Sequence, residues 1–123
     1  MSGVTMGAVE VCPLDVLAPD LGVAALVDGE QVALFRLSDG RLFAVQNQDP
    51  FSGAYVMSRG ITGSRGDEPT IASPVYKQVF SLVTGECLNA QDGEPRPGLS
   101  PHLVTYPVTV DNGQVHLHLA SRS

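Results

Sequence analysis

Three two-residue turn signals, each flanked by apolar and β-branched runs, set the strongest limit on how this chain can fold. They are Asp28-Gly29, Asp39-Gly40 and Asn112-Gly113. A dipeptide of this kind suits the two central positions of a tight hairpin, and the strands beside such a turn run antiparallel. The first two signals predict a three-stranded antiparallel meander over residues 22–45. The third predicts a hairpin that ends in a closing strand at residues 114–119.

The rest of the chain also favours short strands. Thirteen glycines and nine prolines in 123 residues indicate many turns. One helical turn is expected at residues 13–17, and further short strands are expected at 9–12, 70–72, 78–82, 86–88 and 102–110. The length fits one domain. We therefore predict an all-β fold, an antiparallel sandwich or barrel, as a single domain over residues 1–123, with its core at about 9–119 and short flexible termini.

Three stretches between the predicted strands are too elaborate to be simple hairpin connections. They lie near residues 47–60, 73–78 and 89–101. The first belongs to a longer region, 46–66, that has much turn chemistry and little strand pattern. Long loops on a β scaffold commonly carry the function of a domain. We expect any binding site to lie in these loops.

Charge and hydropathy exclude several classes of protein. Thirteen acidic residues against seven basic ones leave a formal net charge of −6. Such a surface repels the phosphates of nucleic acids and anionic membranes, so we expect neither as a partner. No apolar run approaches the ~18 residues that cross a bilayer, and the N-terminus shows no secretory signal. A cytoplasmic location with reduced thiols at Cys12 and Cys87 is therefore expected.

No catalytic or metal-binding residue is predicted. His116 and His118 lie two apart on a predicted strand and would face the same side, but a third metal ligand cannot be named. We interpret both as solvent-facing residues of an edge strand. Cys87 is expected to be a buried core thiol rather than a nucleophile. No glycine-rich nucleotide-binding motif occurs.

Two segments, residues 45–54 and 72–88, carry the most information about function. They resemble the two cluster-binding loops of Rieske [2Fe–2S] domains, and Thr84-Gly85-Glu86 matches the tail of the second loop. One branch of that superfamily is closer still, the small subunits of the assimilatory NAD(P)H-dependent nitrite reductases. The phrases that resemble this branch, in the same order along the chain, are 32–36, 47–54, 58–61 and 73–82.

The resemblance places the four cluster ligands on residues that do not bind clusters. The Cys and His positions of the first loop fall on Asn47 and Asp49, and those of the second fall on Ser73 and Tyr76. A Rieske cluster needs two thiolates and two imidazoles, and these four side chains supply neither. Residues 61–69 also look inserted. The resemblance therefore implies a Rieske-like antiparallel β fold with elaborate loops and no cluster.

The four changed positions have simpler explanations as well. Asn47, Asp49 and Ser73 could be turn residues whose side chains hydrogen-bond nearby backbone. Tyr76 could be an aromatic plug in the volume that a cluster occupies elsewhere. In that case we expect its ring to be buried, against Pro50, Phe51 or Pro74.

By resemblance, the chain is a non-catalytic small subunit of a bacterial NAD(P)H-dependent nitrite reductase, which reduces nitrite to ammonium in nitrate assimilation. Its role would be structural or activity-supporting, through docking of loops 47–60 and 73–80 to the large subunit. No cofactor is expected on this chain, and FAD, sirohaem and an iron–sulfur cluster are expected on the large subunit. A Rieske-type ferredoxin-like electron carrier and a free-standing regulatory or ligand-binding module remain as alternatives.

Three of the seven bases lie on the loops that would meet at one tip. They are Arg59, Arg65 and Lys77. Bases gathered on an otherwise acidic protein predict a partner-binding patch. The alternative is a solvated loop face.

Overall fold

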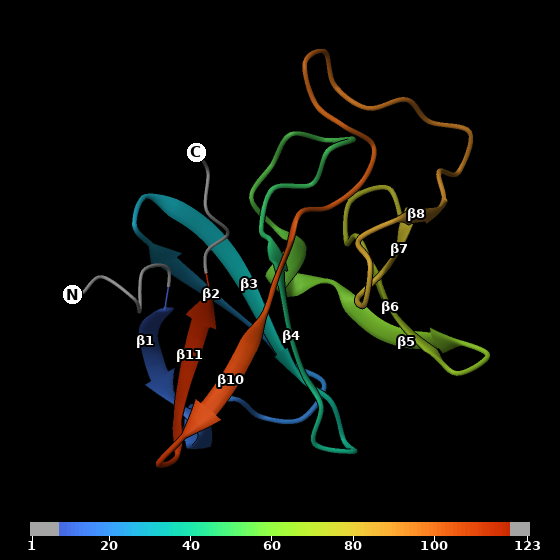
Figure 1. Cartoon of the computed structure of the whole chain (residues 1–123). Coiled ribbons are helices and arrows are strands. Elements are labelled where there is room, and N and C mark those ends of the chain that lie inside the picture. Colours follow the sequence, from blue (N-terminus) through green and yellow to red (C-terminus); the bar gives the residue numbers. More distant parts are fainter. Residues whose placement is uncertain (1–7, 119–123) are drawn as a thin grey trace.

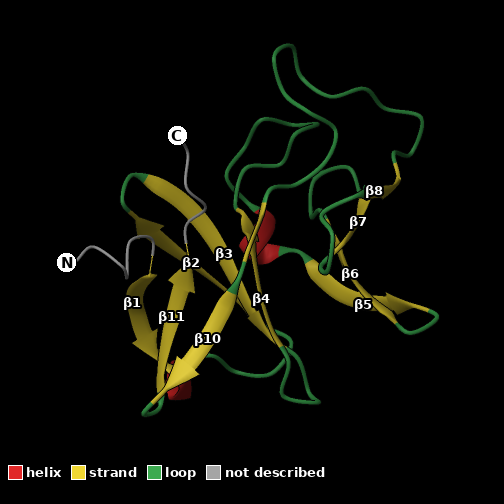
Figure 2. Ribbon diagram, in the orientation of Figure 1, coloured by secondary structure: helices red, strands yellow, loops and turns green. Residues whose placement is uncertain are grey.

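The computed structural model describes residues 8–118, which form three antiparallel sheets (Figures 1 and 2). The predicted terminal segments and Leu119 lie outside the described residues. The elements in chain order are β1 (Ala8–Pro13), the single-turn 3-10 helix η1 (Leu14–Val16), β2 (Gly22–Val27), β3 (Glu30–Arg36), β4 (Leu42–Gln46), the 3-10 turn η2 (Met57–Arg59), β5 (Ile61–Arg65), β6 (Glu68–Ala72), β7 (Val79–Ser81), β8 (Cys87–Asn89), β9 (Thr105–Tyr106), β10 (Val108–Asp111) and β11 (Gln114–His118).

The predicted meander is confirmed as the sheet β2-β3-β4-β9. At the first turn, Asp28 and Gly29 both have positive φ, 50° and 82°, as a tight two-residue hairpin requires. The second turn differs, because only Gly40 is left-handed, at φ 95°. There the backbone N–H of Gly40 donates to the carbonyl of Leu37, so the connection is longer than the dipeptide suggested.

A second sheet has the order β1-β11-β10. The strand β11 is therefore central, and the interpretation of His116 and His118 as edge-strand residues is wrong. A hairpin signal reports only the neighbour along the chain, β10, whereas β1 comes from the other end of the sequence. The pairing of β1 with β11 covers the second edge.

The third sheet has the order β5-β6-β7-β8. The prediction that residues 61–65 belong to a loop is wrong, since they form β5 and pair with β6 from Ile61↔Ala72 to Arg65↔Glu68. This strand lies at the sheet edge, and four of its five residues are exposed. An exposed edge strand needs no alternation of apolar residues, so the sequence carried no strand pattern.

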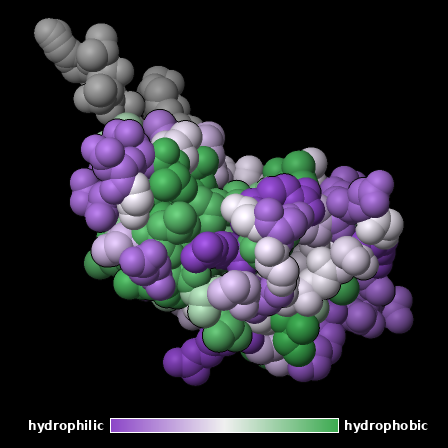
Figure 3. Space-filling view, turned by 90° about the horizontal axis from the view of Figure 1, so that it is seen from below, coloured by the Kyte–Doolittle hydropathy of each residue, from purple (hydrophilic) through white to green (hydrophobic). Residues whose placement is uncertain are grey.

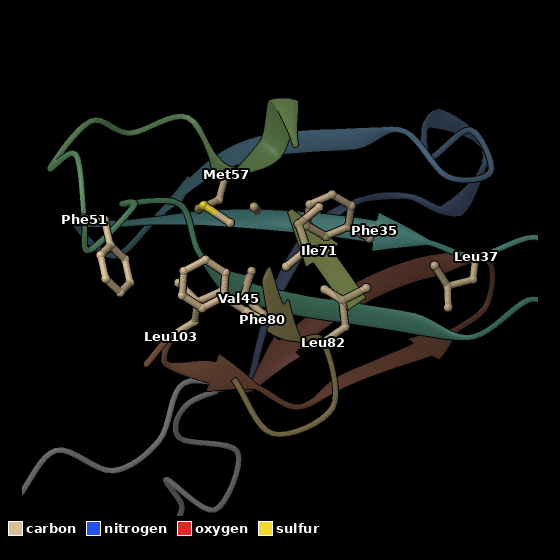
Figure 4. Packing of buried hydrophobic residues seen from close by; sticks show 10 residues of the cluster. Phe35, Leu37, Val45, Phe51, Met57, Ile71, Phe80, Leu82 and Leu103 are labelled. Atoms are coloured by element: carbon tan, nitrogen blue, oxygen red, sulfur yellow. The ribbon is translucent and has the colours of Figure 1, made fainter. Parts of the chain in front are cut away.

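Two hydrophobic clusters fill the interior, and β3 contributes to both. Ala33 and Phe35 belong to one cluster, whereas Val32 and Leu34 belong to the other. Alternate residues of a strand face opposite sides, so β3 lies between two packed layers, as predicted for a β-sandwich. The first cluster lies beneath the loops and includes Phe35, Val45, Phe51, Met57, Ile71, Phe80, Leu82 and Leu103 (Figure 4).

The two ends of the molecule differ. The loops after β4 and β8 lie at the top of Figure 1, whereas η1 and the β10–β11 turn lie at the bottom. Seen from below, the surface carries a hydrophobic area beside hydrophilic ones (Figure 3). Val16 in η1 and Val110 in β10 are among the exposed apolar residues. No helix within residues 8–118 is long and apolar enough to cross a membrane.

Candidate functional site

Two loops meet at the end of the molecule where the sequence predicts a site. The first, residues 47–56, connects β4 to η2, and the second, residues 73–78, connects β6 to β7. Ser73 Oγ donates a hydrogen bond of 2.6 Å to Asp49 Oδ2 across the two loops. Both residues are fully buried. The fold therefore brings into direct contact two of the four positions at which the resemblance places cluster ligands.

Asp49 also organises its own loop. The backbone N–H of Phe51 donates to Asp49 Oδ1 at 2.9 Å, and Ser52 Oγ donates to Oδ2 at 2.9 Å. Together with Ser73, these donors leave the buried carboxyl group well supplied with hydrogen bonds, as a buried polar group requires.

Asn47 closes the same loop at its far end. Its side-chain oxygen accepts a 2.8 Å hydrogen bond from the backbone N–H of Ser58, and its Nδ2 donates to the carbonyl of Tyr55 at 3.2 Å. In the second loop, Ser73 Oγ accepts from the backbone N–H of Val75 at 3.2 Å. These are the contacts expected of residues that fold turns around their side chains.

The expectation that Tyr76 is a buried plug is wrong, because the residue is 60% exposed. Phe51 instead packs inward, with its ring centroid 6.1 Å from that of Phe80, and Met57 is fully buried beside them. The hydrogen bond between the two loops draws them together. This leaves Tyr76 at the surface.

The residues present do not fit a [2Fe–2S] cluster. Asp49 and Ser73 offer hard oxygen donors that are already bonded to each other, and Tyr76 is a phenol where an imidazole is needed. Within residues 8–118, no three His, Cys, Asp or Glu side chains are grouped so that they could hold a metal ion. The two loops therefore lack the ligands that a Rieske cluster needs.

The two thiols, Cys12 in β1 and Cys87 in β8, are both half-buried. Cys87 packs against the cluster beneath the loops, so its predicted core role holds in part. Its backbone N–H donates to His102 Nδ1 at 3.0 Å. Burial raises the pKa of both the Cys12 and Cys87 thiols, which makes their reactive thiolate forms rarer.

The three predicted partner-binding bases are all exposed. Arg59 ends η2, whereas Arg65 ends β5 and donates to the carbonyl of Leu88 at 3.4 Å. Lys77 has a left-handed backbone at φ 68°, and its Nζ donates to the carbonyl of Pro74 at 3.3 Å. The three bases therefore lie on three separate parts of the chain: η2, β5 and the second loop.

The third elaborate loop, residues 89–101, packs against the first. The backbone N–H of Arg96 donates to the carbonyl of Pro50 at 2.8 Å, and its guanidinium donates to the carbonyl of Ser52 at 3.3 Å. The sequence does not predict Arg96 at this end of the molecule, because nothing in the local sequence shows where a long loop folds back.

A hollow of about 350 Å³ opens beside the second loop, lined by Phe51, Tyr76, Gln78, Gln91, Gly93 and Glu94. Gln78 is only 2% exposed. Its Nε2 donates to the carbonyl of Ala90 at 3.4 Å, but its buried Oε1 has no hydrogen-bond partner among the described residues. The sequence does not predict a site at Gln78 either, since nothing in the pattern around a glutamine distinguishes a buried one.

Comparison with known proteins identifies a family and several similar proteins. A family described as the Rieske-like [2Fe-2S] domain matches residues 8–118. The nitrite reductase (NADH) small subunit of Salmonella typhimurium is 44% identical over 79 residues, which are 63% of this chain and 73% of that protein. The crystal structure of a Mycobacterium tuberculosis protein assigned as an NADH-dependent nitrite reductase small subunit has a TM-score of 0.80 and 45% identity, and covers 93% of this chain and 96% of its own.

A longer protein also matches. The nitrite reductase [NAD(P)H] large subunit of Klebsiella oxytoca is 37% identical over 105 residues, which are 85% of this chain. Those residues are only 10% of that protein. This chain therefore spans one small part of a much larger polypeptide in that relative. The predicted resemblance to the Rieske superfamily and to its nitrite reductase branch is confirmed.

Proposed function

On the premise that the chain belongs to the Rieske-like [2Fe-2S] domain family, and within it to the nitrite reductase small subunits, we propose that it docks to a nitrite reductase large subunit and supports its activity. The complex would reduce nitrite to ammonium with NAD(P)H in the cytoplasm, as part of nitrate assimilation. This chain would contribute no reacting group. Its role would be structural.

One observation carries this proposal. A protein named as a nitrite reductase large subunit contains a stretch that matches 85% of this chain. When a domain is part of the partner's own polypeptide in one organism, the same domain is expected to associate with that partner where the two are separate chains.

The side chains of the two loops favour a structural role in the complex over electron transfer. An electron carrier of this fold needs soft thiolate and imidazole ligands for its cluster. Asp49 and Ser73 instead form a hydrogen bond to each other. We propose that this chain binds no cofactor, and that FAD, sirohaem and an iron–sulfur cluster are held by the large subunit.

A direct test of this part is metal analysis after anaerobic purification and cluster reconstitution. We expect no stoichiometric iron and no visible absorption band. Stoichiometric iron with such a band would favour a Rieske-type electron carrier instead. A parallel reconstitution of an authentic Rieske ferredoxin controls for the procedure.

We further propose that Arg59, Arg65 and Lys77 lie on the docking surface. All three are exposed, and substitution of exposed charges usually changes stability by less than about 0.5 kcal/mol. Charges at an interface rim act mainly on the association rate and its salt dependence. Reversal of these charges should therefore weaken docking without unfolding the chain.

The experiment measures co-purification with the large subunit from nitrate-grown cells, together with nitrite-dependent NAD(P)H oxidation. Lys77→Glu, Arg59→Glu and Arg65→Glu are compared with Arg41→Glu, which reverses an exposed base on the β3–β4 connection, outside the loops 47–60 and 73–80. Arg41 lines a hollow with Ser64 and Gly66, next to Arg65, so it serves as the control for Lys77 and Arg59. We expect the first three to reduce both signals and excess subunit to restore activity by mass action. Equal behaviour of all four variants would place the docking face elsewhere. Failure of the parent chain to co-purify would refute the proposed function.

A further inference from the structure

We propose that the hollow beside Gln78 receives a basic side chain, arginine or lysine, of the large subunit. The proposal rests on the proposed function, because it names the group of that partner which this chain would bind. The hollow is lined by Phe51, Tyr76, Gln78, Gln91, Gly93 and Glu94.

The first argument is the state of Gln78. This residue is only 2% exposed, and its Oε1 has no hydrogen-bond partner among residues 8–118. A buried acceptor without a hydrogen bond costs free energy, so native proteins rarely keep one. An incoming donor would remove that cost. The hollow is the opening that this residue lines.

The orientation of the amide follows from its neighbours. Gln78 Nε2 faces the carbonyl of Ala90 at 3.4 Å, which fixes Oε1 as the free end. The same carbonyl already accepts a 2.8 Å hydrogen bond from the backbone N–H of Gly93. Ala90 therefore keeps a hydrogen-bond donor if the Gln78 side chain turns, and the buried Oε1 has to turn toward the hollow to accept from an incoming donor.

The second argument is the mixture of groups around the hollow. Phe51 supplies an apolar floor, and the 60% exposed Tyr76 supplies an aromatic wall. Glu94 supplies a carboxylate from the loop opposite. Long basic side chains combine an apolar stem with a donor head, and an arginine also stacks on aromatic rings. The lining therefore offers apolar and aromatic surface for such a stem and acceptors for such a head.

The third argument is charge. The chain carries a formal net charge of −6, and Glu94 is the only ionisable carboxylate or base among the described residues of the lining. Lys77 lies next to Gln78 in sequence, but its Nζ is held at the carbonyl of Pro74 and it does not line the hollow. A cation therefore meets an acceptor and an opposite charge here.

The test measures the affinity of the purified full chain for the purified large subunit by calorimetry at low salt. Gln78→Met removes the acceptor at similar volume, and Glu94→Gln removes the charge. The matched control is Glu86→Gln, an exposed glutamate outside the lining. We expect binding to weaken about tenfold for Gln78→Met and about fivefold for Glu94→Gln, with the control within twofold.

A thermal melt separates recognition from folding. Gln78→Met discards a buried free acceptor and one long hydrogen bond, so its melting temperature should equal or exceed that of the parent. Weaker binding by a chain that is as stable as the parent supports the proposal. Affinities of both variants within twofold of the parent would overturn it, as would a melting temperature loss that accounts for the weaker binding.

A titration with small probes tests the hollow without the partner. The probes are N-acetylarginine amide and its neutral isostere, N-acetylcitrulline amide, followed by NMR at the side-chain amide of Gln78 and the backbone amide of Gly93. Larger shifts with the arginine probe support the cation site, and equal shifts overturn it. If the parent chain fails to bind the large subunit, the proposed function and the named source of the cation are refuted, while the titration still decides the chemistry of the hollow.

Discussion

The hydrogen bond between Ser73 and Asp49 makes a sharp prediction about stability. Ser73→Ala removes a 2.6 Å bond between two fully buried side chains and also deprives the Val75 N–H of its acceptor. A buried hydrogen bond contributes about 1 kcal/mol net, and a group left without a partner adds about 1–3 kcal/mol. Asp49 keeps Ser52 as a second donor on the same oxygen. We therefore expect a loss of about 2 kcal/mol.

Asp49→Ala should cost more, about 4 kcal/mol, because it orphans the Phe51 N–H, Ser52 Oγ and Ser73 Oγ together. The double variant should cost less than the sum of the two by about 1–2 kcal/mol, since each change removes the same bond. These are large fractions of a total stability of about 5–15 kcal/mol.

Equilibrium urea unfolding measures all three variants, and an unchanged m-value shows that midpoints can be compared directly. The matched control is Ser64→Ala in the exposed strand β5, which should lie within about 0.5 kcal/mol of the parent. If Ser73→Ala unfolds like this control, or if the two effects simply add, the loops are not held together by this bond.

Three further predictions concern other parts of the chain. Tyr76→Ala should unfold within about 0.5 kcal/mol of the parent in urea, because its ring is 60% exposed; a loss above 2 kcal/mol would show a packed ring. Gly85→Ala should lose more than about 2 kcal/mol, measured by thermal melting, because Gly85 has φ 82° and a Cβ there would lie 2.0 Å from the carbonyl oxygen of Leu103. Iodoacetamide should alkylate Cys12 and Cys87 more slowly in the native chain than in urea near pH 8, since burial raises their pKa values and lowers the thiolate fraction. The difference should shrink as the pH rises, and equal rates near pH 8 would contradict it.

Much of the fold could be predicted because its signals are local. The turns at Asp28-Gly29 and Asn112-Gly113 set antiparallel neighbours that the structure contains, with left-handed backbone at all four residues. The apolar run that follows the first turn likewise predicted the partner strand, which the structure contains as β3. A tight turn and a period of two constrain only residues a few positions apart, which a sequence displays directly.

The sequence could locate the candidate site, but it could not show which of the site's side chains are buried. The resemblance marked Asn47, Asp49, Ser73 and Tyr76 as the positions of lost ligands, and the structure joins Asp49 to Ser73. It could not show that Tyr76 turns outward. Whether a loop side chain is buried depends on which other loop it meets, and that partner is 24 residues away for Asp49.

The sequence alone therefore determined the antiparallel strands, the loop positions and the family resemblance, because turn chemistry and motif spacing are properties of neighbouring residues. Only the tertiary structure decided that β11 is central, that 61–65 is an edge strand and that Gln78 is buried with a free acceptor. Each of these depends on contacts between distant segments. Such contacts form when packing buries the apolar area of one segment against a distant segment, and the local sequence does not show which segment that is.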